Sequence, residues 1–150
     1  MAEHVTHSEG ETAAIGRALG RTLRSGKVVL LNGPLGAGKT AFARGLAEGL
    51  GADGEDVSSP TFTIIQEYRG RVALQHIDLY RLTPPEVDDL ALEDLMEDSV
   101  LAVEWPERWR RAPADAIVVT IEPLNDTRRK ITIGARTASE VRTSKLELRS

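Results

Sequence analysis

The sequence predicts an α/β fold, with three α/β/α layers around a mixed β-sheet, and three observations support this prediction. Short, uninterrupted apolar runs at 28–31 and 100–103 are typical of strands that are buried on both faces. The first run leads into a glycine-rich turn and then into an amphipathic helix, which is how many α/β folds begin. Two other segments carry hairpin patterns, which an all-parallel sheet would not contain.

The first third of the chain is predicted to form helix, strand and helix. Ser8 and Glu11 have the spacing of a capping box, in which two side chains satisfy free backbone N–H groups at a helix start. Apolar residues then recur every fourth position up to residue 23. A strand is predicted at 27–31. The second helix begins at Lys39, and its apolar stripe consists of Phe42, Leu46 and Leu50.

The later elements are predicted from β-branched and aromatic runs for the strands and from cap residues for the helices. They are, in chain order, a hairpin of strands 61–68 and 72–78, short helices at 84–90 and 92–96, a strand at 100–103, and a second hairpin of strands 117–121 and 130–133. Thr83 and Pro84 mark the first short helix, because Thr caps N–H groups and Pro suits the first helical turn. Asn125 and Asp126 mark the turn of the second hairpin.

Length and composition predict a single domain over 1–150 with a polar tail from about residue 137. The hydrophobic fraction of 41% is enough for a core, and the lack of cysteine excludes disulfides and thiolate chemistry. The net charge of −4 argues against a broad basic surface that binds nucleic acid unaided. The longest aliphatic runs are four residues, and the N-terminus has no signal-peptide pattern. A cytoplasmic location without membrane contact is therefore expected.

The strongest motif lies at 33–40, which reads Gly-Pro-Leu-Gly-Ala-Gly-Lys-Thr and matches the phosphate-binding pattern G-x-x-x-x-G-K-[ST]. Glycines let backbone N–H groups converge on phosphate oxygens, and the following helix presents its positive dipole end. The lysine adds a full charge and the threonine hydroxyl suits Mg²⁺. The residues predicted to bind the nucleotide are Gly36, Ala37, Gly38, Lys39 and Thr40. The motif indicates a nucleoside triphosphate with Mg²⁺.

A P-loop enzyme usually needs a second carboxylate near Mg²⁺, at the end of a neighbouring strand. Asp78 and Glu104 each follow a predicted strand, and Glu104 follows the more continuous apolar run. Thr61, in the segment 58–61, is a second hydroxyl that could approach the metal or the γ-phosphate from a loop, or could simply begin a strand. These residues and Lys39 form the candidate catalytic set.

Other features of the sequence leave alternatives open. The guanine-reading motif N-K-x-D is missing, which favours ATP. The basic cluster at 108–111 could imitate the arginine lid of a small-molecule kinase, or could be a solvated helix face. His76 is expected to be a packed, hydrogen-bonded side chain rather than a general base. Trp105 fits packing better than base stacking.

Four motifs occur in an order and at separations that closely resemble the TsaE (YjeE) family: GPLGAGKT, SSPTFTIIQEY, HIDLYRL and VEWPER. The resemblance extends from about Glu9 to Gly134. Proteins of this family are bacterial P-loop ATPases required for N6-threonylcarbamoylation of the adenosine beside the anticodon, in tRNAs that read codons beginning with A. The combination of the last three motifs is specific to the family, whereas the first is generic.

The resemblance implies roles for individual residues. Lys39 and the loop amides would hold the phosphates, and Thr40 and Glu104 would ligate Mg²⁺. The other residues given a place at the site are Thr61 and Asp78 near the γ-phosphate and metal, Trp105 beside them, Arg128 as a nucleotide contact, and Glu9 at the border of the adenine.

The resemblance also implies partners. In this family the carbamoyl transfer belongs to TsaD working with TsaB, while TsaE joins that pair, hydrolyses ATP and resets the complex. Such proteins are poor ATPases alone, and they meet tRNA only through the complex. Two other functions remain compatible with the residues, namely a small-molecule P-loop kinase and a scaffold that binds nucleotide without hydrolysing it.

Overall fold

The computed structural model describes residues 2–34, 36–53 and 64–136, and these contain a seven-stranded mixed sheet with order β1-β7-β6-β2-β5-β4-β3. The elements are, in chain order, β1 (Ala2–Thr6), α1 (Glu9–Gly20), β2 (Val28–Asn32), α2 (Lys39–Gly49), β3 (Ile65–Tyr68), β4 (Ala73–Asp78), α3 (Pro84–Asp89), α4 (Leu92–Leu95), β5 (Ser99–Glu104), the 3₁₀ turn η2 (Pro106–Arg108), β6 (Ile117–Pro123) and β7 (Arg129–Ala135).

The centre of the sheet is parallel and its edges are antiparallel. Strand β2 lies between β5 and β6 and is parallel to both, and β4 is parallel to β5. The two predicted hairpins are confirmed as the antiparallel pairs β3–β4 and β6–β7. The carboxyl ends of β2, β4 and β5 therefore meet at one edge of the sheet, where α/β proteins bind their ligands.

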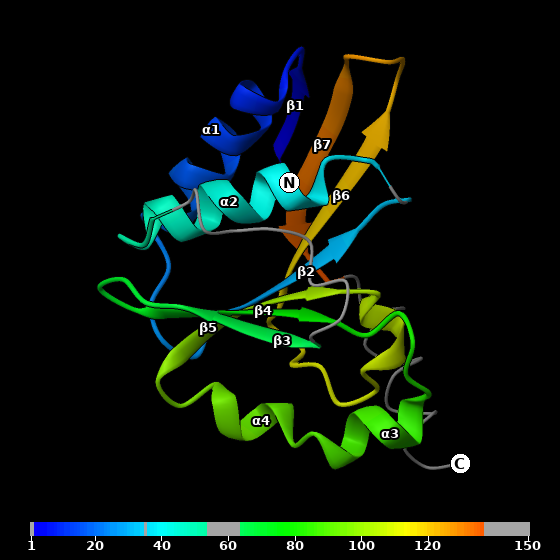
Figure 1. Cartoon of the computed structure of the whole chain (residues 1–150). Helices are drawn as coiled ribbons and strands as arrows, with labels where there is room; N and C mark the ends of the chain where they lie inside the picture. Colours follow the sequence, from blue (N-terminus) through cyan, green and yellow to red (C-terminus); the bar gives the residue numbers. More distant parts are fainter. Residues whose placement is uncertain (1, 35, 54–63, 137–150) are drawn as a thin grey trace.

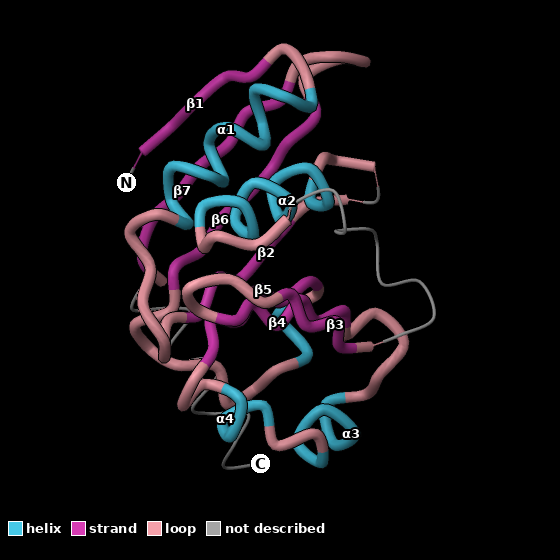
Figure 2. The backbone as a smooth tube through the Cα atoms, turned by 60° about the vertical axis from the view of Figure 1, so that its left-hand side comes forward, coloured by secondary structure: helices cyan, strands magenta, loops and turns pink. Residues whose placement is uncertain are grey.

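Two apolar clusters pack on opposite faces of the sheet and confirm the three-layer prediction. Along β2, Val29 and Leu31 join the cluster under α1 and α2, while Val28 and Leu30 join the cluster over α3 and α4. This alternation is the period-two geometry of a strand buried on both faces. Figures 1 and 2 show α1 and α2 on one side of the sheet and the shorter α3 and α4 on the other.

Helices α1 and α2 contact each other through glycines. A Cβ atom on Gly45 would lie 1.9 Å from the carbonyl oxygen of Ala13, and one on Gly16 would lie 2.3 Å from that of Phe42. The two backbones are therefore in direct contact, which the apolar stripes of the sequence did not indicate. As a result, the start of α1 lies beside the start of α2.

Two features of the N-terminus differ from the prediction. Strand β1 was not predicted, because its residues are mostly exposed and polar, and backbone pairing with β7 is what orders them. The Ser8 hydroxyl accepts from the Glu11 N–H at 3.1 Å, as expected, but the Glu11 carboxylate accepts from the N–H of His7 instead of Ser8. The capping box is thus half formed. At Thr83 and Glu86 both of its hydrogen bonds are present.

Within the described ranges, no helix combines the length and the apolar character needed to cross a membrane. The predicted polar tail, 137–150, and the segment that carries Thr61 lie outside those ranges.

Candidate nucleotide-binding site

The glycine loop joins the end of β2 to the start of α2, and its conformation requires glycine. Gly33 has φ +152°, and a Cβ there would lie 2.7 Å from the carbonyl oxygen of Ile121. Gly38 precedes α2 with φ +107°. No side chain of the described residues caps this helix, so its first N–H groups are available to an anionic ligand.

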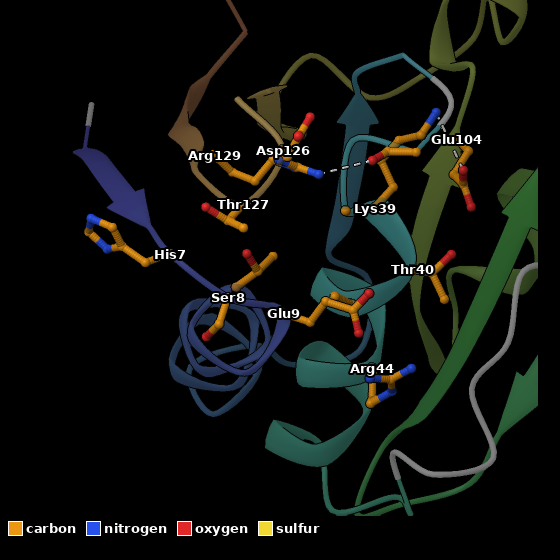
Figure 3. Close-up of a pocket in the computed structure, with 14 residues that line it drawn as sticks. His7, Ser8, Glu9, Lys39, Thr40, Arg44, Glu104, Asp126, Thr127 and Arg129 are labelled. Carbon is orange, nitrogen blue, oxygen red and sulfur yellow. Dashed lines mark hydrogen bonds and ion pairs between the residues drawn. The ribbon is translucent and has the colours of Figure 1, made fainter. Parts of the chain in front are cut away.

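Lys39 folds back over the loop and reaches a buried acid. Its Nζ donates to the carbonyl oxygen of Gly33 at 2.8 Å and lies 3.5 Å from Oε1 of Glu104. The other carboxylate oxygen, Oε2, lies 2.8 Å from Nε2 of His76. All three side chains are buried. Figure 3 shows Lys39 and Glu104 pointing toward each other.

These contacts keep Glu104 ionised. Burial acts to raise the pKa of Glu104, but the hydrogen bond from His76 and the charge of Lys39 outweigh it and leave the pKa below its ordinary value. The carboxylate at the end of β5 is therefore an anionic oxygen donor at neutral pH.

Asp78 and Trp105 lie next to this cluster. Asp78 is the register partner of Glu104 on the neighbouring strand, and its Oδ1 accepts from the N–H of Tyr80 at 2.9 Å. The Trp105 ring centre is 5.1 Å from Nζ of Lys39 and 4.9 Å from the Tyr80 ring centre. Trp105 has a left-handed backbone, with φ +59°, immediately after Glu104. Both residues thus flank the acid, and neither is among the described residues that line the cavity.

A cavity of about 500 Å³ lies beside the glycine loop and is lined by the start of α1 and the β6–β7 turn (Figure 3). Of the predicted site residues, it is lined by Glu9, Gly36, Gly38, Lys39, Thr40 and Glu104. The residues that sequence reasoning missed are His7, Ser8, Thr12, Ala41, Arg44, Asp126, Thr127 and Arg129. Arg44 could have been found, because it lies one helical turn after Thr40 on the same face of α2.

Arg129 was missed because the family resemblance implied a nucleotide contact for its neighbour Arg128, and no local signal in the sequence distinguishes the two arginines. Its Nε donates to the Ala37 carbonyl at 2.9 Å, and its Nη1 donates to the Asn125 carbonyl at 2.8 Å. It therefore fastens the β6–β7 turn to the glycine loop. Arg128 does not line the cavity, and its backbone N–H donates to the Asn125 side chain within the turn.

The residues present fit a magnesium nucleotide. Lys39 and the uncapped helix start suit phosphates, while the Thr40 hydroxyl and the ionised Glu104 are the hard oxygen donors that Mg²⁺ prefers. Among the described residues, no group of three His, Cys, Asp or Glu side chains could hold a metal alone. This agrees with Mg²⁺, which commonly takes one or two protein ligands together with substrate phosphates and waters.

The basic cluster at 108–111 lies away from this cavity. Arg108 donates to the Leu82 carbonyl and Arg110 to the Asp88 carboxylate, both at 2.7 Å, and Trp109 packs in the cluster on the α3 face. These arginines hold the chain after β5 against α3, which differs from the position a kinase lid would need.

This arrangement defines the class of P-loop NTPases. It consists of a strand, a glycine loop ending in Lys39 and Thr40, a helix, and an acid at the end of the adjacent parallel strand. Residues 6–131 match the family model described as "Threonylcarbamoyl adenosine biosynthesis protein TsaE". The chain belongs to the TsaE family, as the four motifs indicated.

Relatives and a solved structure agree with this membership. The "tRNA threonylcarbamoyladenosine biosynthesis protein TsaE" of Treponema pallidum is 42% identical over 132 residues, which cover 86% of this chain and 97% of that protein. The protein of the same name from a Nostoc species is 47% identical over 116 residues, or 73% of this chain and 71% of that one. The crystal structure of YdiB from Bacillus subtilis aligns with a TM-score of 0.74 and 32% identity, covering 98% of this chain and 93% of that one.

Proposed function

We propose that this chain is a Mg²⁺-dependent ATPase that serves the biosynthesis of threonylcarbamoyladenosine in tRNA. The observation that carries the proposal is the buried Lys39–Glu104 pair, which brings the cation for phosphate and the anion for a metal together at one cavity. The names of the relatives support the pathway. We also propose that residues 1–150 act as one domain and work in the cytoplasm.

The residues of the glycine loop would bind the triphosphate. Lys39 would exchange its contacts with Gly33 and Glu104 for phosphate oxygens, and the N–H groups of Gly36, Ala37 and Gly38 would donate to the phosphates. Thr40 and Glu104 would hold Mg²⁺. When bound, Mg²⁺ supplies positive charge to the phosphate oxygens. Hydrolysis joins a water oxygen to the γ-phosphorus, breaks the bond to ADP and releases phosphate.

Three further residues complete the proposed site. Thr61 would approach the γ-phosphate, and Asp78 would support the metal from the end of β4, beside Glu104. Glu9, which lines the cavity, would accept a hydrogen bond from the amino group of adenine. The missing N-K-x-D motif supports ATP over GTP.

Partners would control this activity. We propose that the chain works with TsaD and TsaB and meets tRNA only within that complex, since its net charge of −4 does not suit independent RNA binding. The test is ATP turnover by the purified chain, alone and with the TsaD–TsaB pair, with Glu104→Ala as the inactive control.

Each outcome separates the alternatives. Turnover that rises with the pair supports the proposal. ADP formed together with a phosphorylated small molecule would identify a kinase, and ATP binding without any turnover would identify a scaffold.

A further inference from the structure

His76 is buried at a cost that packing alone does not explain. Its ring is fully buried in β4, and its Nδ1 has no hydrogen-bond partner among the described residues. A buried polar atom without a partner destabilises the folded state, and an aliphatic side chain would avoid that cost. Within the described part of the chain, the ring makes one hydrogen bond, to Glu104, and this bond is the feature that accounts for histidine here.

The direction of this hydrogen bond follows from the acceptor. Glu104 is an ionised carboxylate, so its Oε2 can only accept, and Nε2 of His76 must carry the proton. This holds for the neutral ring and for the charged ring alike. His76 is thus a donor to one oxygen of the carboxylate, and Lys39 approaches the other oxygen.

The strand register makes the contact possible. His76 pairs with Ala102 on β5, and Glu104 lies two residues beyond Ala102 on the same face of that strand. Ala102 belongs to the apolar cluster beneath α2, so all three side chains face the glycine-loop helix. The methyl group of Ala102 leaves the imidazole room to reach along the sheet to Glu104.

We infer that His76 is a positioning residue for the metal carboxylate: by holding Oε2 of Glu104, it leaves Oε1 directed at the cavity for Mg²⁺. This inference rests on the proposed function, because it assigns Glu104 to the metal. Residues that orient a metal ligand in this way typically contribute about 10- to 100-fold to metal affinity or activity.

Two amide variants test the hydrogen bond with matched polarity. The Nε2 of the glutamine in His76→Gln can take the place of the imidazole Nε2 and donate to Glu104. The asparagine in His76→Asn ends near the position of Nδ1 and cannot reach the carboxylate. His4→Asn, on the exposed strand β1, controls for the same change away from the site.

The measurement is the affinity for ADP by calorimetry, once with Mg²⁺ and once with a chelator. We expect His76→Asn to reduce the gain in affinity that Mg²⁺ provides by about tenfold or more, while affinity for metal-free ADP stays unchanged. His76→Gln should keep most of the gain. Three results would overturn the inference: an unchanged gain in His76→Asn, an equal loss of metal-free affinity, or a His76→Gln variant as poor as His76→Asn.

A second test uses the wild-type chain alone and therefore does not depend on whether either variant folds. Nitrogen-15 NMR of the His76 ring should show the proton on Nε2, slow to exchange with solvent, and a proton on Nδ1 alone would overturn the inference. The same calorimetry separates the two proposals. If Mg²⁺ does not raise the affinity of the wild-type chain for ADP, the proposed function fails. If Mg²⁺ raises the affinity of the wild-type chain and of His76→Asn equally, the proposed function stands and the positioning role fails.

Discussion

At the scale of single residues, the ammonium group of Lys39 is held by a small number of polar and aromatic contacts. Lys39 is buried, and within the described ranges its ammonium group contacts the Gly33 carbonyl, the Glu104 carboxylate and the face of Trp105. Gly33 and Glu104 belong to neither apolar cluster, and Trp105 is only partly buried against one of them, so Lys39 can reorient toward a phosphate without opening the core of the sheet.

Lys39→Ala is expected to weaken binding of Mg-ATP by at least about tenfold and to leave the fold intact. The change removes a charge-assisted contact, which is worth roughly 1.5–3 kcal/mol. Calorimetric titration measures the affinity, and circular dichroism checks the fold. Lys130→Ala is the matched control, because Lys130 pairs with Glu3 on the outer strands. Unchanged affinity together with unchanged turnover would contradict the assigned role.

Arg129→Ala is expected to lower the affinity for ATP, whereas Arg128→Ala should have little effect. Arg129 donates to carbonyls of both the glycine loop and the β6–β7 turn, so its removal frees the loop to adopt conformations that do not bind phosphate. Calorimetry on the two neighbouring variants provides the comparison. A larger loss in Arg128→Ala would instead support the nucleotide contact that the family resemblance implies for Arg128.

At the scale of elements, contact between α1 and α2 sets the width of the cavity. Gly16 and Gly45 bring the two backbones together, and Arg17 on α1 donates to Glu48 on α2 at 2.8 Å. The first residues of α1, which line the cavity, are therefore held at a constant distance from the glycine loop at the start of α2.

Gly45→Ala is expected to destabilise the chain, whereas Gly10→Ala should be neutral or stabilising. The new methyl group at residue 45 would meet the Ala13 carbonyl, and overpacking of this kind costs typically about 1–3 kcal/mol or more. At residue 10 the nearest atom is the Ser8 hydroxyl at 3.8 Å, and alanine favours a helix by about 1 kcal/mol. Urea denaturation compares the two. Equal free energies of unfolding for Gly45→Ala and Gly10→Ala would contradict the direct backbone contact between α1 and α2.

The cap of α3 should make stability depend on acid pH. The backbone N–H of Thr83 donates to the Glu86 carboxylate and holds the pKa of Glu86 below its ordinary value of about 4.5. Because the folded pKa lies below the unfolded one, this contribution is present above about pH 4.5 and is lost as the pH falls through the folded pKa.

Glu86→Gln should therefore show a smaller loss of stability than wild type as the pH is lowered below about 4.5. The urea midpoint at several pH values measures this dependence, and the exposed Glu93→Gln in α4 is the control. Parallel curves for wild type and Glu86→Gln would show that the cap carries no such dependence.

At the scale of the whole molecule, we expect the isolated chain to be a weak ATPase, even though its cavity offers candidate ligands for phosphate and metal. Arg108 and Arg110 are bound to the α3 side, so they do not serve the cavity. The sequence shows no clear glutamine to orient the attacking water. Slow hydrolysis by the isolated chain is the expected consequence.

The TsaD–TsaB pair is expected to raise ATP turnover by at least about tenfold, equivalent to about 1.4 kcal/mol of barrier. A partner surface that contributes a positive charge would explain the increase, since an arginine supplied in trans is worth about 10³–10⁵ in well-studied P-loop enzymes. Thr61→Ala and Glu104→Ala should lose most of the stimulation and retain some nucleotide binding. Fast ATP turnover by the isolated chain, with no change when the TsaD–TsaB pair is added, would contradict this mechanism.

Much of the fold could be predicted because the signals were local. The strand before the glycine loop, the cap at Thr83 and the two hairpins arise from residues within a few positions of one another. Strand β1 could not be predicted, since its exposed residues acquire their order only by pairing with β7, near the other end of the described chain.

The sequence by itself determined the fold class, the phosphate-binding loop and the family, because periodicity, caps and glycine spacing act between near neighbours. The tertiary structure decided which groups meet. His76 contacts Glu104 across 28 positions, and Arg129 contacts Ala37 across 92. The contact of His76 with Glu104 follows from the register of β4 and β5, which pairs His76 with Ala102. Register is a property of paired strands, and no single segment contains it.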